Sequence, residues 1–295
     1  MYLICMKGYY NMDLTSPRTI RNIQEQFGFT FKKGLGQNFL TARNILEEIV
    51  DAAEIESGVI EVGPGFGVLT SELAQNSDKV VTIEIDERLI DVLDYTLAEY
   101  DNVKIINEDI LKLDLKKVID DEFNGEKVSI AANLPYYITT PIITKLLEEK
   151  LPIKNIVVMV QKEVAERMST KPSTKDYGAI TVLCQYYTEP SIVANVPASL
   201  FVPPPKVDSA VLKLKILDKP SVEVKDESVF FRVVKAAFSQ RRKTLLNCLS
   251  ANFPIPKDEI STLLESIGIA PSRRGETLSL EEFANIADTL LQKIK

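Results

Sequence analysis

An amide, a proline and an aromatic ring follow one another at residues 133–136 (Asn-Leu-Pro-Tyr). The preceding run 127–130 has the composition of a buried strand, and the hydroxyls and proline at 139–141 predict the start of a helix. The tetrapeptide is therefore expected at the carboxyl end of a strand, where open α/β sheets bind ligands. Asn133 offers an acceptor and Tyr136 a flat face, which suit the exocyclic amine of a nucleobase taken out of its stack. An ordinary strand-to-helix turn is the alternative.

A glycine loop and two acids indicate a second ligand. Three glycines at 63, 65 and 67 follow the apolar strand 59–62, so the backbone can approach a ligand closely at the start of the next helix. Their spacing, G-x-G-x-G, differs from the G-x-G-x-x-G of dinucleotide-binding proteins. Glu84 lies roughly 20 residues further on, at the separation where an acid reaches ribose hydroxyls. Asp109 follows a third strand, and the order of these motifs is a stronger signal than any one of them.

The elements that must position these residues alternate along the chain. Apolar runs predict strands at 79–85, 103–107 and 155–161, and helical spacing predicts helices at about 19–27, 42–53, 161–168 and 177–187. Two further strands, near 191–196 and 207–216, are joined by a proline-stiffened loop, which suits an antiparallel edge added to a parallel sheet. The sequence therefore predicts an α/β fold with its ligands at one edge of the sheet.

The pattern changes after residue 217. A short linker, 218–221, precedes segments with helical spacing only, at 229–238, 243–253 and 260–267, and a capping box at Ser279 and Glu282 opens the last helix. We expect a flexible leader at 1–17, a catalytic, cofactor-binding domain at 18–217 and a helical domain at 218–295. The true start of translation is left open among the first methionines.

Composition excludes several classes of protein. The 295 residues contain no histidine, so the hydrolases that use histidine as a base or ligand are excluded. The three cysteines stand singly, which argues against a disulfide framework or a zinc site, and no apolar run approaches the length of about 18 residues that a membrane span needs. The net charge is −7, but residues 51–150 alone carry −13 and the remainder is basic. That asymmetry permits an RNA-binding face.

Three segments have two interpretations each. The basic, glycine-containing loop 32–40 is either a solvated connector or part of a ligand site. Phe201, in the run 201–206 (Phe-Val-Pro-Pro-Pro-Lys), either fills the core or is presented rigidly by its prolines. The run 240–243 (Gln-Arg-Arg-Lys) is either a solvated corner between two helices or a phosphate contact.

From residue 18 onward the chain resembles the KsgA (RsmA) family of small-subunit ribosomal RNA adenine N6-dimethyltransferases, which are related to the Erm methyltransferases. Seven runs carry the resemblance: 36–40 (Gly-Gln-Asn-Phe-Leu), 61–65 (Glu-Val-Gly-Pro-Gly), 133–136, 161–164 (Gln-Lys-Glu-Val), 201–209, 240–244 and 273–279. The last of them fits KsgA better than Erm proteins, whose ending is shorter. The resemblance implies a Rossmann-like class I S-adenosylmethionine-dependent methyltransferase sheet with a small all-α C-terminal domain.

The resemblance also implies roles for individual residues. S-adenosylmethionine would bind, without a metal, at Asn38, Leu40, Gly63, Glu84, Asp109 and Asn133. The Asn133 side chain and the Leu134 carbonyl would accept hydrogen bonds from the N6 amine of adenine. Tyr136 and Phe201 would stack on the flipped base. Arg241, Arg242 and Lys243 would contact RNA.

The expected activity is N6,N6-dimethylation of two adjacent adenosines in the 3′-terminal hairpin loop of 16S rRNA, on the immature small (30S) subunit. We expect a cytoplasmic monomer that has no membrane partner. The alternatives are a non-catalytic assembly factor, an Erm-like 23S rRNA methyltransferase and a DNA adenine N6-methyltransferase. A dehydrogenase is disfavoured by the glycine spacing.

Overall fold

The computed structural model describes residues 12–29 and 38–294, and its contacts divide the chain into two compact units. The first unit comprises Met1–Lys162 and Val193–Lys213, and the second comprises Glu163–Ile192 and Leu214–Lys295. The division at 213/214 lies close to the predicted boundary at 217/218. The sequence did not predict that 163–192 would group with the C-terminal helices.

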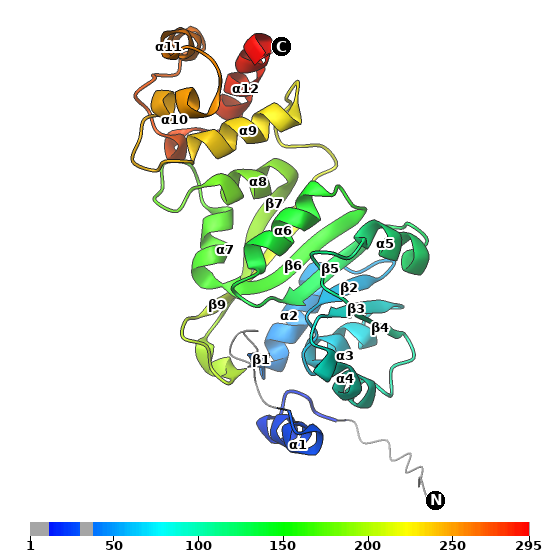
Figure 1. Ribbon diagram of the computed structural model, residues 1–295. Coiled ribbons are helices and arrows are strands. Elements are labelled where there is room, and N and C mark those ends of the chain that lie inside the picture. Colours follow the sequence, from blue (N-terminus) through cyan, green and yellow to red (C-terminus); the bar gives the residue numbers. More distant parts are fainter. Residues whose placement is uncertain (1–11, 30–37, 295) are drawn as a thin grey trace, which may run out of the picture. The chain divides into compact units, whose positions relative to one another are not determined.

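A seven-stranded sheet with the order β4-β3-β2-β5-β6-β9-β7 runs through the fold (Figure 1). Its strands are β2 (Val59–Val62), β3 (Val80–Glu84), β4 (Val103–Asn107), β5 (Val128–Asn133), β6 (Ile153–Gln161), β7 (Thr188–Val196) and β9 (Ser209–Ile216). The pairs of β2 with β3 and β5, of β3 with β4, and of β5 with β6 are parallel. The chain builds outward from β2 to β4 and then returns to place β5 on the other side of β2. Open α/β sheets bind ligands at such a reversal of strand order.

The two closing strands occupy the edge of the sheet where the sequence predicted them. The structure adds a small antiparallel pair that was not predicted, between β1 (Phe39–Leu40) and β8 (Phe201–Val202). Thr41 reinforces this pair, because its backbone N–H and its hydroxyl both donate to the Leu200 carbonyl oxygen, at 2.9 and 2.8 Å.

The helices of the first unit are α1 (Pro17–Phe27), α2 (Arg43–Ala53), α3 (Val68–Gln75), α4 (Ile90–Thr96), α5 (Leu115–Phe123) and α6 (Thr139–Glu148). Helix α2 packs on β5 and β6, and α3 packs on β3. The apolar faces of α1 to α4 and residues of the strands form one core. Within the described residues, no helix is long and apolar enough to cross a membrane.

Two local predictions in this unit were wrong. Residues 1–11 of the predicted leader lie outside the described part, but Leu14 is buried in the core, so the ordered chain begins before residue 18. The threonine hydroxyls were predicted to cap helix α6, but the helix begins at Thr139, and its N-cap residue is Ile138, which provides no side-chain hydrogen bond. The Thr139 hydroxyl instead donates back to the Pro135 carbonyl oxygen at 3.2 Å. This internal bond removes the hydroxyl from the capping role.

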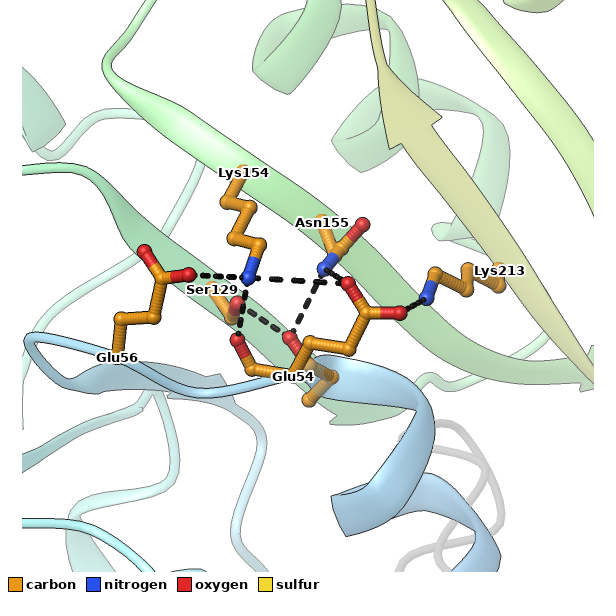
Figure 2. A network of polar contacts seen from close by, with 7 residues as sticks. Glu54, Glu56, Ser129, Lys154, Asn155 and Lys213 are labelled. Carbon is orange, nitrogen blue, oxygen red and sulfur yellow. Dashed lines mark hydrogen bonds and ion pairs between the residues drawn. The ribbon is translucent and has the colours of Figure 1, made fainter.

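A polar network holds the end of α2 against the sheet (Figure 2). The Ala53 carbonyl oxygen, left without a helical partner, accepts from Ser129 Oγ at 2.6 Å and from Asn155 Nδ2 at 3.0 Å. Glu54 pairs with Lys213 at 2.6 Å, and Lys154 pairs with Glu56 at 2.6 Å. The network anchors the helix whose Leu46 and Ile49 line the cavity described below.

The second unit is helical apart from the ends of β7 and β9 that enter it. It contains α7 (Lys162–Ser169), which starts at the last residue of the first unit, and α8 (Ala179–Tyr187), α9 (Glu227–Ala237), α10 (Leu245–Asn252), α11 (Lys257–Ser266) and α12 (Leu280–Ile294). Helices α8 to α12 share a core of their own. The predicted capping box is confirmed: Ser279 N–H donates to Glu282 Oε2 at 2.9 Å, and Glu282 N–H donates to Ser279 Oγ at 3.2 Å.

Candidate active site

A cavity opens in the first unit at the carboxyl ends of β2, β3, β4 and β5. It brings together the six residues that the sequence assigned to the cofactor. The lining includes Asn38, Leu40, Gly63, Glu84, Asp109 and Asn133, together with apolar side chains such as Leu46, Ile85, Ile110, Ile138 and Met159. Strand order explains why Gly63, Glu84, Asp109 and Asn133 meet, because parallel strands end at one edge and β2 lies between β3 and β5. Asn38 and Leu40 come instead from β1 and the residue before it.

The glycine loop lines this cavity with backbone that carries no side chain at Gly63 and Gly65. Gly63 has φ +71°, and a Cβ at this position would meet nothing within 4 Å, so its backbone is open to a ligand. Gly65 has φ +60°, and a Cβ there would lie 2.6 Å from Cε1 of Phe39. The Phe39 ring stacks on Phe66 with centroids 4.3 Å apart. Packing against Phe39 therefore requires a glycine at position 65, whereas Gly63 leaves its backbone accessible to a ligand.

Two buried acidic residues line the cavity from the strands next to the loop, Glu61 in β2 and Glu84 in β3. Glu84 is 5% exposed and accepts from the Asp86 N–H at 2.8 Å, and burial raises its pKa to about 7. Glu61 is 1% exposed and accepts from Thr70 Oγ1 at 2.6 Å, and burial raises its pKa to about 8. The sequence assigned no role to Glu61, although an acid inside an apolar strand was a visible signal.

Asp109 belongs to the same cavity but is held by its own loop. Its Oδ1 accepts from the Leu111 N–H at 3.0 Å, and Lys112 lies 3.7 Å from Oδ2. Among the described residues, no group of three or more metal-ligating side chains comes together.

Asn133 ends β5 with its side chain oriented by a neighbour. Its Nδ2 donates to the Asn38 carbonyl oxygen at 3.0 Å, and because a carbonyl only accepts, the amide nitrogen must face Asn38. The Leu134 N–H donates to the Met159 carbonyl oxygen at 3.1 Å, which fixes the backbone beyond the strand. Within the described part of the chain, neither Asn133 Oδ1 nor the Leu134 carbonyl oxygen accepts a hydrogen bond. Asn133 lines the cavity and Leu134 follows it directly in the chain, so two adjacent unpaired acceptors lie at this edge.

The two predicted stacking residues differ in exposure. The Tyr136 ring is half-buried, its hydroxyl lies 2.8 Å from Ser209 Oγ, and burial raises its pKa. Phe201 is 3% exposed, lies in the core of the first unit and pairs with Leu40 across the β1–β8 ladder. Of the two interpretations left open for Phe201, the structure shows the packing one, and a stacking role would require the ring to leave the core.

Tyr137 was not assigned by the sequence. It lines the cavity and is 59% exposed. Its position directly after Asn-Leu-Pro-Tyr (133–136) was the feature of the sequence that could have indicated a role.

Arg241, Arg242 and Lys243 lie in the second unit, between α9 and α10, and all three are exposed. The Arg241 guanidinium donates to the Lys175 carbonyl oxygen. The Lys243 N–H donates to the Gln240 carbonyl oxygen at 2.9 Å, which closes the turn. The structure thus gives Arg241 a structural partner, whereas the side chains of Arg242 and Lys243 have none in the described part of the chain. Their RNA contact stays a prediction.

Comparison with known proteins identifies relatives over nearly the whole chain. The family model described as ribosomal RNA adenine dimethylase matches residues 28–292. The chain is 54% identical over 285 residues to ribosomal RNA small subunit methyltransferase A of Bacillus mycoides (strain KBAB4), a match that covers 95% of this chain and 98% of that one. The protein of the same name from Bacillus cereus (strain B4264) has the same identity and coverage.

Two solved structures share the fold. A dimethyladenosine transferase from Plasmodium falciparum is 30% identical with a TM-score of 0.70, over 84% of this chain and 95% of that chain. The 23S rRNA methyltransferase ErmE is 28% identical with a TM-score of 0.65, over 86% and 100%. The Rossmann-like class I methyltransferase fold with a helical C-terminal region is therefore confirmed. With a family match that spans most of its length, this chain belongs to the ribosomal RNA adenine dimethylases.

Proposed function

We propose that this protein transfers methyl groups from S-adenosylmethionine to N6 of two adjacent adenosines in the 3′-terminal hairpin loop of 16S rRNA, forming N6,N6-dimethyladenosine. The observation that supports this function most directly is a pair of unpaired acceptors: Asn133 Oδ1, from a residue that lines the cavity of the glycine loop, and the carbonyl oxygen of the next residue, Leu134. The relatives at 54% identity carry a small-subunit name, which favours 16S over 23S rRNA.

The groups that line the cavity suit the parts of S-adenosylmethionine. The open backbone at Gly63 would lie against the methionine part, Glu84 would accept from the ribose hydroxyls, and Asp109 would accept from the adenine amine. Asn38 and Leu40 would cover the ligand from the segment that precedes α2 and contains β1. When bound, the sulfonium supplies an already activated methyl group.

The protein's main task is then to position the amine. The lone pair of the N6 amine is delocalised into the adenine ring, so it is a poor nucleophile. In the first transfer, hydrogen bonds to Asn133 Oδ1 and the Leu134 carbonyl oxygen would hold both amine hydrogens and favour the pyramidal nitrogen of the transition state. In the second transfer, the one remaining hydrogen would donate to one of these acceptors. As the nitrogen–carbon bond forms and the sulfur–carbon bond breaks, the amine becomes cationic and loses one proton to solvent. No strong base is needed, and the chain has no histidine to provide one.

The further parts of the proposal concern partners. The basic residues at 241–243 would contact phosphates of the immature small subunit, on which a monomer of this protein would act in the cytoplasm. Tyr136 would stack on the flipped adenine. A non-catalytic assembly factor would bind the same subunit but would not need the two available acceptors.

The deciding experiment is mass analysis of small subunits incubated with the protein and S-adenosylmethionine. Subunits that lack the modification should gain N6,N6-dimethyladenosine at two adjacent positions near the 3′ end of 16S rRNA. Large subunits and duplex DNA treated in parallel should remain unmodified. Binding of the small subunit without any methylated adenosine would instead support the assembly factor.

A further inference from the structure

A tight turn carries both tyrosines that follow Asn133. The Ile138 N–H donates to the Pro135 carbonyl oxygen at 3.2 Å, so Tyr136 and Tyr137 are the two central residues of a four-residue turn. The Thr139 hydroxyl donates to the same carbonyl oxygen at 3.2 Å. These bonds, together with the start of α6, hold the turn in one conformation.

The two rings meet different environments. Tyr136 is half-buried and its hydroxyl is held at Ser209. Tyr137 is 59% exposed and contributes to the cavity lining. Within the part of the chain that the structure describes, its ring stacks on no other aromatic ring and its hydroxyl has no hydrogen-bond partner. Tyr137 is therefore an open aromatic face at the cavity.

We propose that Tyr137 is a stacking platform for the nucleotide next to the target adenosine, an inference that rests on the function proposed above. The target amine must reach the acceptors at Asn133 and Leu134 inside the cavity. More than half of the Tyr137 surface is exposed to solvent, and the RNA strand that carries the extruded nucleotide would pass over this surface. A base at that place has lost its own stacking neighbour, and a protein ring replaces it.

The geometry makes such a contact efficient. Because the turn already fixes the backbone, only the two side-chain torsions of tyrosine have to be ordered when a base stacks on the ring. Stacking of one base on an aromatic side chain is worth about 1–3 kcal/mol, which corresponds to a change of about 5- to 150-fold in affinity. The contact involves no base edge, so it should tolerate any base and favour purines for their larger face.

The test uses a small-subunit hairpin RNA with 2-aminopurine at the nucleotide next to the target, and the variants Tyr137→Phe, Tyr137→Leu and Tyr137→Ala. Wild-type protein and Tyr137→Phe should quench the fluorescence on binding, whereas the leucine and alanine variants should not. The KM for unlabelled RNA should rise at least about 5-fold in the last two variants. Affinity for S-adenosylmethionine should be unchanged in all three.

A control is Tyr95→Leu, because Tyr95 is also exposed but lies on α4 outside the cavity lining, where its ring packs on Phe27 with centroids 5.5 Å apart. Its quenching and KM should equal those of the wild type. Reduced cofactor affinity in Tyr137→Leu with an unchanged RNA KM would overturn the inference and make Tyr137 a wall of the cofactor site. Unchanged quenching in Tyr137→Ala would overturn it as well. If the wild type quenches the probe but never methylates RNA, the stacking contact stands and the proposed function fails.

Discussion

The cavity and the basic turn at 241–243 differ in how the protein holds their polar side chains. In the cavity, Asn133 is oriented by Asn38 and Glu84 by the Asp86 N–H, and both lie among apolar residues. In the turn, Arg242 and Lys243 are exposed and have no side-chain partner among the described residues. Oriented groups in a largely apolar site can favour a transition state, whereas exposed charges add binding without fixing geometry. Substitutions in the first region should therefore change rates, and those in the second should change salt dependence.

The largest effect is expected for Asn133→Ala. This change removes an acceptor for the amine, and removal of one such preorganised partner costs about 10²–10³ in rate. Single-turnover methylation at saturating S-adenosylmethionine measures it, and RNA affinity, measured separately, should be nearly unchanged. A variant that dimethylates at close to the wild-type rate would contradict the role of Asn133. An equal loss of RNA affinity would remove the contrast between the two regions.

Glu84→Gln tests the cofactor side of the cavity. The ionised carboxylate accepts hydrogen bonds from the ribose hydroxyls more strongly than the protonated form does. Because the folded pKa of Glu84 is about 7, affinity of the wild type for S-adenosylmethionine should rise as the pH is raised through that value. An amide at this position cannot ionise, so calorimetric titration of the E84Q protein should show weaker binding above the pKa and a flatter pH profile. A profile as steep as that of the wild type would assign the titration to another group.

Glu61→Gln tests how the buried carboxyl of Glu61 makes the free energy of unfolding depend on pH. The folded pKa of Glu61, about 8, lies above its ordinary value of 4.5, so the protonated form is favoured in the folded state. Its contribution to stability is therefore fully present below about pH 4.5 and is lost as the pH rises toward 8. In that window the free energy of unfolding should fall by roughly 1 kcal/mol per pH unit because of this group. A glutamine side chain keeps an acceptor for Thr70 and cannot ionise.

Thermal unfolding, followed across the pH window between these two pKa values, provides the measurement. The E61Q protein should lose less stability than the wild type as the pH rises. Parallel curves for the two proteins would show that Glu61 is not the group that titrates.

The smallest effects are expected in the basic turn. Replacement of Arg242 and Lys243 by Ala should lower the slope of log affinity against log salt by roughly 1 for each phosphate that the protein no longer neutralises. Arg241→Ala offers a matched contrast, because it also removes the bond to the Lys175 carbonyl oxygen and should lower the thermal stability of the second unit. An unchanged salt slope in the R242A/K243A protein would make this turn a solvated corner.

Local sequence patterns determined most of the elements. Apolar runs placed β2 and β4 at their observed bounds, and the capping box placed the start of α12. These features depend on residues close together in the chain, which is why they can be read without a structure. The order of the glycine loop, the two acids and Asn133 along the chain also predicted their meeting at one edge of the sheet.

Tertiary structure decided the features that depend on distant residues. The pairing of β1 with β8 joins Leu40 to Phe201 and buries a ring that the sequence left open between core and site. The grouping of 163–192 with the C-terminal helices likewise depends on packing between distant segments. The difference between Tyr136 and Tyr137 also depends on a distant residue, because only the fold brings Ser209 to the first tyrosine and leaves the second exposed. Sequence determined which groups this protein has for its chemistry, and packing decided which of them face the cavity.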